Sequence, residues 1–424
     1  MGESSVRRRG GRLSAVASLS VGLLALSAVM APAAWGAARP SASGGAICHN
    51  GQEVVVGEDV ALSGPNSFLG NNDVLGATAY FDQLNKQGGL DGCKFKIVQE
   101  NNQSTPSLAA SIVRKLVTED HANFIFGPEE TADTVAALPV ENAMHVVSFM
   151  WSSGWNIAGT SYADNHGYGF PGIVDAFLNF DYTTITQLIV PRHYTRVALI
   201  EDNTPGGLEN KAYMEQAAKK YHFKLVATQI VNLGQTDDTP QVLNLLGAKP
   251  QIIDFGLTPG QDSVTVIKTV RAQNTEIPMA TCAGCALASF VKAVGGPTEM
   301  HNVYSFGTPA MLAQVLPHTK ANLPTINDIN NYYAAMKAAG YGGVDQLNAG
   351  IEGWATAREL VTAIKDAKSL NEDAVKNAAA HERVDALGVT WERTPKNYLH
   401  TVADQTVLAV TNPDGTFSGY KPQA

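Results

Sequence analysis

The stretch from Val54 to Asn102 reads VVVGEDVALSGPNSFLGNNDVLGATAYFDQLNKQGGLDGCKFKIVQENN, and it decides the fold class. An apolar run ends at the turn Ser63-Gly64-Pro65, and a loop rich in Gly and Asn follows. A helical pattern from Asp73 to Lys86 then stops at Gly88-Gly89, before a second strand at Phe95 to Val98. This is a β-loop-α-turn-β unit. In open parallel sheets small ligands bind at the carboxyl ends of the strands, so the polar loop is a candidate ligand wall.

Strand and helix patterns continue to alternate along the chain. Apolar residues at helical spacing follow Thr105-Pro106, and a similar series of elements begins near Tyr182. Expected strands lie at 122–126, 146–150, 196–202, 223–231, 251–256, 278–281, 387–391 and 406–410, and expected helices include 134–143, 326–339 and 346–365. This order predicts an α/β fold of two doubly wound lobes, each with a parallel sheet.

The first 36 residues are expected to be an export signal that is removed. Arg7 to Arg9 and Arg12 form a basic start, Leu13 to Met30 is apolar and uncharged, and Ala34-Trp35-Gly36 supplies small residues for cleavage. A membrane anchor is the alternative, because the apolar stretch approaches the length of a span. A removed signal predicts a periplasmic or secreted protein.

The composition indicates a globular chain with two domains. About 390 residues follow the signal, which exceeds the size at which one hydrophobic core stops growing. Hydrophobic residues make up 45% and charged residues 16%, and the formal net charge is -9. No basic cluster follows the signal, so nucleic acid is not an expected partner.

Four cysteines in an exported chain indicate disulfides. Cys48 precedes the first strand and Cys93 opens the second, so neighbouring strands would let them bridge. Cys282 and Cys285 form a CxxC pair, which fits a small-loop disulfide, a redox pair or half of a metal site. Zinc needs further ligands that the chain does not offer at the usual spacing, which leaves a structural disulfide or two reduced thiols. No metal or cofactor is expected.

Catalytic signatures are missing from the sequence. There is no GxSxG elbow, no HExxH helix and no P-loop, and the histidines do not have metal-ligand spacing. The expectation is therefore a binding protein and not an enzyme. A secreted hydrolase of unknown mechanism is the enzymatic alternative.

A set of motifs resembles the type I periplasmic solute-binding proteins, and within them the branched-chain amino-acid (Leu/Ile/Val) binding family of ABC transporters. The motifs are Ser63-Gly64-Pro65, Gly70, Gly76-Ala77, Asn85 and Gly88 to Gly92, followed by Phe124 to Pro128, Val197 to Asp202 and Gly388 to Glu392. The resemblance covers essentially all of the chain after the signal.

The resemblance implies two lobes joined by a hinge of three strands, which close on a ligand in the cleft. Lobe 1 would comprise 46–170 plus 306–386, and lobe 2 would comprise 171–305 plus 387–424. The chain would cross near 168–172, 304–308 and 385–388. The implied function is capture of a small organic ligand for the permease of an ABC importer by a monomer. A ligand-sensing receptor on the same fold is the alternative.

The resemblance also implies the ligand-binding residues. In the family, hydroxyls and backbone N–H groups after two lobe-one strands hold the carboxylate of an amino acid. The matching loops here are Gly127 to Thr134 and Ser148 to Ser153, with further loops after strands of lobe 2. The residues implied are Phe68, Leu69, Glu129, Glu130, Thr131, Met150, Trp151, Ser152, Asn203, Thr204, Thr258 and Cys282.

Two departures from the family pattern concern charge. The loop that carries an acidic residue for the ligand's ammonium group is Thr-Cys-Ala-Gly-Cys-Ala here, at 281–286, and Glu129 and Glu130 occupy a loop that usually carries small hydroxyl residues. A buried carboxylate needs a partner. If either Glu faces the cleft, the ligand must be cationic or donate hydrogen bonds, whereas both side chains could instead point to solvent. An amide, a small peptide, an amine or a mostly apolar compound therefore fits as well as an amino acid.

Overall fold

The computed structural model of the protein describes residues 46–48, 51–64, 67–151, 167–171, 181–232, 235–256, 261–273, 275–281, 285–394, 401–402 and 407–420. Residues 46–424 form one compact unit. The expected export signal, 1–36, lies outside the described residues. Within the described residues, the helices are too short or too polar to span a bilayer.

The first sheet consists of five parallel strands in the order β2-β1-β3-β4-β5. They are β1 (Glu53–Val60), β2 (Lys94–Asn101), β3 (Phe124–Phe126), β4 (Ser148–Met150) and β5 (Gly169–Pro171). The helices that accompany them are α1 (Ser67–Lys86), α2 (Pro106–Thr118), α3 (Thr131–Met144), α13 (Ile351–Ala367) and α14 (Glu372–Ala379).

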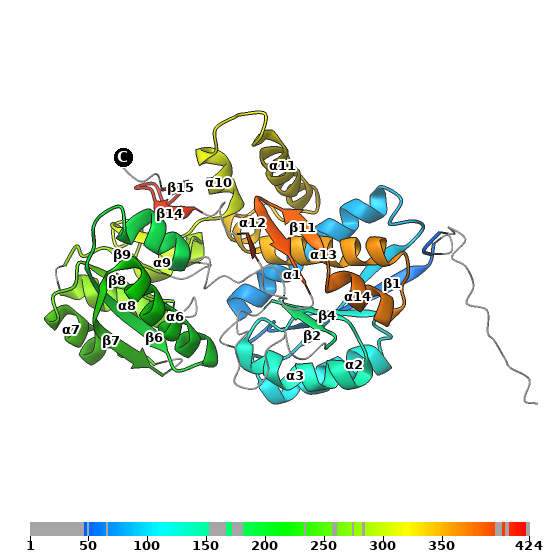
Figure 1. Ribbon diagram of the computed structural model, residues 1–424, viewed down its shortest axis with the longest axis horizontal. Coiled ribbons are helices and arrows are strands. Elements are labelled where there is room, and N and C mark those ends of the chain that lie inside the picture. Colours follow the sequence, from blue (N-terminus) through cyan, green and yellow to red (C-terminus); the bar gives the residue numbers. More distant parts are fainter. Residues whose placement is uncertain are drawn as a thin grey trace, which may run out of the picture. The chain divides into compact units, whose positions relative to one another are not determined.

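Helices cover both faces of the first sheet (Figure 1). Successive side chains of a strand point to opposite faces. Val54 and Val56 therefore pack with α1, α13 and α14, while Val55 packs with α2 and α3 on the other face. On the first face the rings of Phe81 and Phe95 stack 4.7 Å apart. The apolar run that opens the sequence is thus a central strand buried from both sides.

The second sheet repeats this strand order. Its seven strands run β15-β14-β10-β9-β8-β6-β7, and the five from β10 to β7 are parallel. They are β6 (Arg196–Asp202), β7 (Lys224–Val231), β8 (Ile252–Asp254), β9 (Met279–Ala280) and β10 (Val303–Phe306), with β14 (Leu408–Thr411) and β15 (Phe417–Gly419) antiparallel at the edge. In chain order the parallel strands are again arranged 2-1-3-4-5. The predicted fold class, with two parallel-sheet lobes, is confirmed.

The remaining helices follow the expected alternation with small differences. They are η1 (Ile185–Ile189, a π-helical turn), α6 (Pro205–Tyr221), α7 (Thr239–Gly247), α8 (Gln261–Ala272), α9 (Ala288–Val294), α10 (Pro309–Val315), α11 (Leu323–Ala338) and α12 (Val344–Ala349). The single helix expected over 346–365 is divided into α12 and α13 at Gly350, whose added Cβ would lie 2.9 Å from the Gln346 carbonyl oxygen.

Helix α1 begins earlier than the sequence predicts. The expected loop ran to Gly70, whereas the helix starts at Ser67. The Asn71 side chain donates to the carbonyl oxygens of Ser67, at 2.6 Å, and Leu62, at 3.3 Å. The hydrogen bond to Leu62 ties the first turns of the helix to the segment that follows β1.

A tight hairpin occupies the region where the third crossing was expected. Strands β11 (Arg383–Ala386) and β12 (Val389–Glu392) are antiparallel, and β12 also pairs with β13 (Thr401–Val402). Leu387 and Gly388 both have positive φ, at 53° and 96°, as a two-residue hairpin turn requires. The chain therefore turns back at 385–388, and the expected crossing there is wrong.

The second strand of this hairpin, β12, packs with helix α13. Trp391 joins the cluster that contains Ala355, and the Arg393 guanidinium forms ion pairs with the buried carboxylates of Glu359 and Glu382. It also donates to the carbonyl oxygen of Pro171 at the end of β5. Residues 389–393 thus lie against elements of the expected lobe 1, although the sequence assigned 387–424 to lobe 2. The rest of the division into lobes remains a prediction.

The predicted connecting segment at 304–308 lies beside the start of β14. The backbone N–H of Gly307, which follows β10, donates to the carbonyl oxygen of Val407 at 2.7 Å. Val407 directly precedes β14, which pairs with β10. This hydrogen bond continues the β10–β14 ladder to the point where the chain leaves the second sheet.

The first cysteine prediction is confirmed. Cys48 and Cys93 form a disulfide at the amino-terminal edge of the first sheet. Cys285 is also disulfide-bonded, and Cys282 lies outside the described residues. Among the described residues, no group of His, Cys, Asp and Glu has the geometry to hold a metal ion.

Candidate functional site

The carboxyl ends of the first and third strands define the candidate site in each sheet. In the order 2-1-3-4-5, the connections from the first strand leave in opposite directions, which opens a crevice beyond the strand ends. In the first sheet the switch lies between β1 and β3, and in the second sheet it lies between β6 and β8. The sequence-predicted loops at Gly127 and Asn203 follow β3 and β6, so they are at these edges.

The loop after β3 turns sharply beside β1. Gly127 has φ of 86°, and a Cβ added there would lie 2.1 Å from the Asp59 carbonyl oxygen. Glycine is therefore required for both the conformation and the close approach. The turn carries the chain through Glu129 and Glu130 into α3, which begins at Thr131.

Glu129 points into the first lobe. Its two carboxylate oxygens lie 3.2 and 3.3 Å from the backbone nitrogen of Ala61, which donates to them. The side chain also fills the space beside Gly70, where an added Cβ would meet Glu129 Oε1 at 2.3 Å. Burial raises the pKa of Glu129 well above its usual range, against the lowering effect of the Ala61 hydrogen bond. Glu129 thus ties the loop after β3 to the loop after β1.

The next residue, Glu130, is partly exposed, and the charges that act on it are those of other acidic residues. Burial, together with the charges of Asp202 and Asp133, raises its pKa from 4.5 to about 7. Asp202 is the last residue of β6, in the second sheet. The loop after β3 and the end of β6 are therefore within electrostatic range of each other. Of the two glutamates, Glu130 is the more exposed, and its contact with a ligand remains a prediction.

The loop after β6 is held by its own side chains. Asp202 Oδ1 accepts hydrogen bonds from the Thr204 backbone, at 2.9 Å, and from the Thr204 hydroxyl. The Thr204 hydroxyl oxygen in turn accepts from the Gly207 backbone at 3.2 Å, which caps α6. Asn203 is exposed and donates to the Asn232 side chain at 3.0 Å. The edge is thus fixed in shape before any ligand binds.

Met150 and Trp151 are core residues in the structure. Their relative exposures are 0% and 4%, and both belong to the main core cluster of the first lobe. The Trp151 indole N–H donates to the Thr356 hydroxyl on α13 at 3.1 Å. The sequence interpretation placed Trp151 in the cleft because it follows a strand end. The structure does not support that contact, because the ring turns back against α13 and β3.

The other predicted residues are placed only in part. Thr131 is buried in the first turn of α3. Phe68 and Leu69 lie in the first turn of α1, and their side chains are outside the described part of the structure. Ser152, Thr258 and Cys282 also lie outside the described residues. The ligand contacts of these residues remain predictions.

Four acidic residues at the same edges were missed by the sequence interpretation: Asp133, Glu201, Asp202 and Asp254, which are all at most 3% exposed. Glu201 accepts from the Asn210 side chain and from the Gly256 backbone, the latter at 3.2 Å. Burial raises the pKa of Asp254 to about 7. The available signal was the pair of adjacent acids near the end of each first strand, Glu58-Asp59 in β1 and Glu201-Asp202 in β6.

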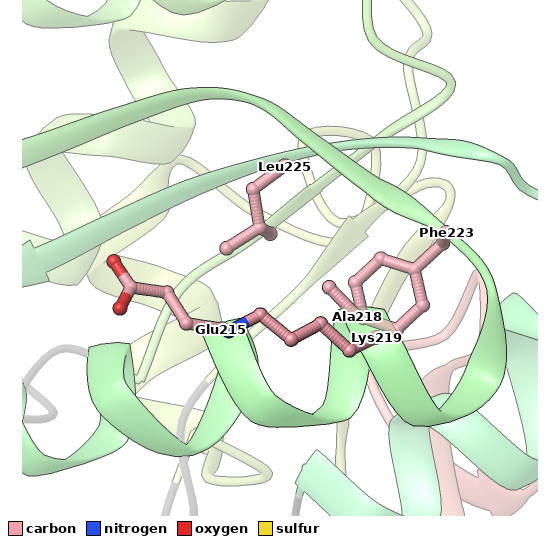
Figure 2. Close-up of a pocket in the computed structure, with 5 residues that line it drawn as sticks. All are labelled: Glu215, Ala218, Lys219, Phe223 and Leu225. Carbon is pink, nitrogen blue, oxygen red and sulfur yellow. The ribbon is translucent and has the colours of Figure 1, made fainter.

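A surface pocket lies away from these edges. It has a volume of about 280 Å³ and is formed by the second half of α6 and the start of β7 (Figure 2). Its lining residues are Glu215, Ala218, Lys219, Phe223 and Leu225. The start of β7 is at the opposite edge of the second sheet from the strand ends described above. None of the predicted ligand residues lines this pocket, so it is not the candidate site.

The model of the family described as periplasmic binding protein matches residues 53–415. The chain belongs to the periplasmic binding protein family. Among similar curated proteins are the Leu/Ile/Val-binding protein homolog 1 of Brucella suis biovar 1, 23% identical over 60% of this chain and 67% of the relative, and an amino acid binding protein of Pseudomonas aeruginosa, 21% identical over 65% and 72%. The chain matches 54% of the length of the homolog from Brucella abortus.

Solved structures share the fold at low sequence identity. A protein of Rhodopseudomonas palustris (strain CGA009) has a TM-score of 0.75 and 18% identity, over 87% of this chain and 100% of that chain. A branched-chain amino acid transporter substrate binding protein of Streptococcus pneumoniae, in complex with isoleucine, has a TM-score of 0.68 and 18% identity, over 88% and 100%. A solute binding protein of R. palustris, in complex with 4-hydroxybenzoate, has a TM-score of 0.69 and 14% identity, over 88% and 98%.

Proposed function

We propose that this protein is the extracytoplasmic solute receptor of an ABC importer, which captures a small organic ligand between its lobes and delivers it to the permease. The observation that carries the proposal is the equivalent strand order of the two sheets, which puts the Glu130 loop after β3 at one switch point and Asp202 at the end of β6 at the other. Each edge is the switch point of its own sheet, where ligands of open α/β sheets bind. Family membership and the predicted export signal agree with this role.

Capture would proceed by closure of the lobes about their connecting segments. A ligand that contacts both edges stabilises the closed arrangement by the difference between its affinities for the two states. The hydrogen bond from Gly307 to Val407 holds the predicted connecting segment at 304–308 against the start of β14, antiparallel to it. It would therefore guide the lobes along one direction of movement. The closed form would be the one that the permease recognises.

The class of ligand is a small organic molecule. The two relatives with named ligands hold isoleucine and 4-hydroxybenzoate, which differ in shape and in charge. Thr131, which is buried in the first turn of α3, would offer its hydroxyl group to the ligand. We infer that an amino acid, amide, peptide or related compound is bound in contact with Thr131 and the Glu130 loop.

A thermal-shift screen of amino acids, amides, short peptides, polyamines and aromatic acids tests the proposal. A ligand at about a hundred times its Kd stabilises the folded protein by about 2.7 kcal/mol, which is readily measured as a rise in melting temperature. Calorimetry then gives Kd for the compounds that shift it.

Variants locate the site. Thr131→Ala should weaken binding of the identified compound, whereas Thr118→Ala, at the exposed end of α2, is the matched control and should not. Chemical turnover of the bound compound, or an unchanged Kd in Thr131→Ala, would contradict the assignment.

A further inference from the structure

We propose that Asp345 and Asn348 on α12 form a latch between the two lobes, which stabilises the closed arrangement that holds the solute. The inference rests on the proposed function and adds two positioning residues that lie outside the predicted ligand contacts. It concerns the described residues of α12 and the segment from Ala286 to Ser289 at the start of α9.

Helix α9 receives its N-terminal cap from another helix. Its own N-cap residue is Leu287, whose apolar side chain cannot accept hydrogen bonds from the first backbone N–H groups of the helix. The Asp345 carboxylate accepts them instead. Its Oδ1 accepts from the Ala288 nitrogen at 2.8 Å, and its Oδ2 accepts from the Ser289 nitrogen at 3.2 Å. The start of α9 is thus fixed by a residue that follows Ala288 by 57 positions.

A third hydrogen bond supports the same contact. Asn348 donates from its side-chain amide to the carbonyl oxygen of Ala286 at 2.8 Å. Residues three positions apart on a helix lie on one face, so Asp345 and Asn348 are presented together. Both side chains are half-buried. Helix α12 therefore accepts from N–H groups and donates to a C=O group of one short segment, which fixes the segment in both position and direction.

The two helices belong to different lobes by their packing. In α9, Phe290 and Val291 belong to the core cluster of the second sheet, which contains Met279 of β9. Helix α12 contacts α1, which covers the first sheet, and its Leu347 carbonyl oxygen accepts from the Tyr332 hydroxyl of α11 at 2.8 Å. The hydrogen bonds of Asp345 and Asn348 therefore join the body of the first sheet to that of the second.

These hydrogen bonds are formed while the two candidate edges are together. Helix α3 follows the loop after β3, and α6 follows the loop after β6. The two helices have Cα atoms within 8 Å of each other. A solute that contacts both loops needs this arrangement. Because hydrogen bonds weaken steeply beyond about 3.2 Å, rotation of one lobe away from the other would break the latch. The latch therefore favours the closed arrangement over the open one.

Loss of the latch should shift the balance between these arrangements toward the open one. Hydrogen bonds to a charged group change an equilibrium by about tenfold or more. Asp345→Ala should therefore reduce the ratio of closed to open molecules by about this factor. The affinity for a solute that only the closed arrangement holds falls in proportion to the closed fraction.

Distance measurements between spin labels test the latch, in the protein without its export signal and without added solute. Labels at Ser107→Cys on α2 and Asn244→Cys on α7 report on the two lobes, because both positions are exposed and the helices pack on different sheets. The parent should show one main distance. Asp345→Ala should add a second population, about tenfold smaller in the parent. Asn348→Ala should act in the same direction, and Asp345→Asn, which keeps an acceptor oxygen, should restore most of the parent distribution.

Asn371→Ala is the matched control, because Asn371 caps a helix within the first lobe. Its side chain accepts from the Ala374 nitrogen at the start of α14 at 3.2 Å. Both cap variants should lower the free energy of unfolding in urea, but only Asp345→Ala should change the distances.

A distance distribution in Asp345→Ala that equals that of the parent would reduce Asp345 to a helix cap and overturn the latch. That result would leave the receptor function intact, since the measurement uses no solute. Failure of every compound in the broad screen to bind contradicts the receptor function itself, whatever the labels report.

Discussion

Replacing Glu141 with Gln should stabilise the folded protein at neutral pH and leave its stability unchanged at acidic pH. Glu141 lies on α3 and is fully buried. The Ser148 hydroxyl donates to its Oε2 at 2.7 Å, and its Oε1 is buried without a partner. Burial raises the pKa of Glu141 from 4.5 to about 8, against the lowering effect of the Ser148 hydrogen bond.

The magnitude follows from linkage between protonation and folding. Because the folded-state pKa exceeds the unfolded value, the folded protein keeps a proton that the unfolded chain releases as the pH rises above 4.5. Stability contributed by this group is present below 4.5 and is lost progressively up to about 8. At neutral pH the loss is about 3 kcal/mol, at about 1.4 kcal/mol for each pH unit. Gln has nearly the same shape and keeps an oxygen that accepts the hydrogen bond from Ser148, but it cannot ionise.

Urea unfolding followed by tryptophan fluorescence, at about pH 4.5 and about pH 7, measures the effect. The variant should be about 3 kcal/mol more stable than the parent at the higher pH and equal to it at the lower. Glu119→Gln is the control, since that side chain is exposed, and should not alter the pH dependence. A Glu141→Gln protein that is less stable than the parent at the higher pH would refute the reasoning.

Two further predictions concern cross-links in the fold. Arg393→Met should destabilise the protein by about 3–5 kcal/mol, because it leaves the buried carboxylates of Glu359 and Glu382 unpaired. Urea unfolding measures this change. A free energy of unfolding equal to that of the parent would show that these ion pairs are dispensable. Replacing Cys48 and Cys93 together with Ser should cost about 4 kcal/mol, as the disulfide closes a loop with a sequence separation of 45. An unchanged unfolding midpoint in the double variant, or after reduction of the parent, would contradict that estimate.

The fold class was predictable because it is encoded in local patterns. The apolar run Val54–Val60 and its helix, turn and second strand specify a β-α-β unit without reference to distant residues. The hairpin at Leu387 was not predictable in the same way. A leucine at positive φ is uncommon, and here Asp328 accepts a hydrogen bond from its backbone N–H at 2.8 Å. That contact depends on α11, which is distant in sequence.

The sequence predicted which loops follow the strand ends, but not the directions in which their side chains point. Loops after parallel strands lie at one edge of a sheet, so strand order alone predicts that Gly127 to Thr131 and Asn203-Thr204 follow strand ends at such an edge. Glu129 and Glu130 are adjacent, yet one accepts from Ala61 inside the lobe and the other is within range of Asp202. Their directions depend on the turn at Gly127. Trp151 was misplaced for a similar reason, since its hydrogen bond to Thr356 is a long-range contact.

The repeated strand order separates recognition from folding. Each sheet has its own core, and each would contribute one side of the proposed binding region through a loop that follows a strand. A change of charge in the loop of one sheet leaves the packing of the other sheet unchanged. Such a protein can acquire a new ligand by substitutions in one loop, while the loop of the other sheet retains its existing ligand contacts. Divergence of ligand preference within a constant architecture is then a matter of a few loop residues in either half.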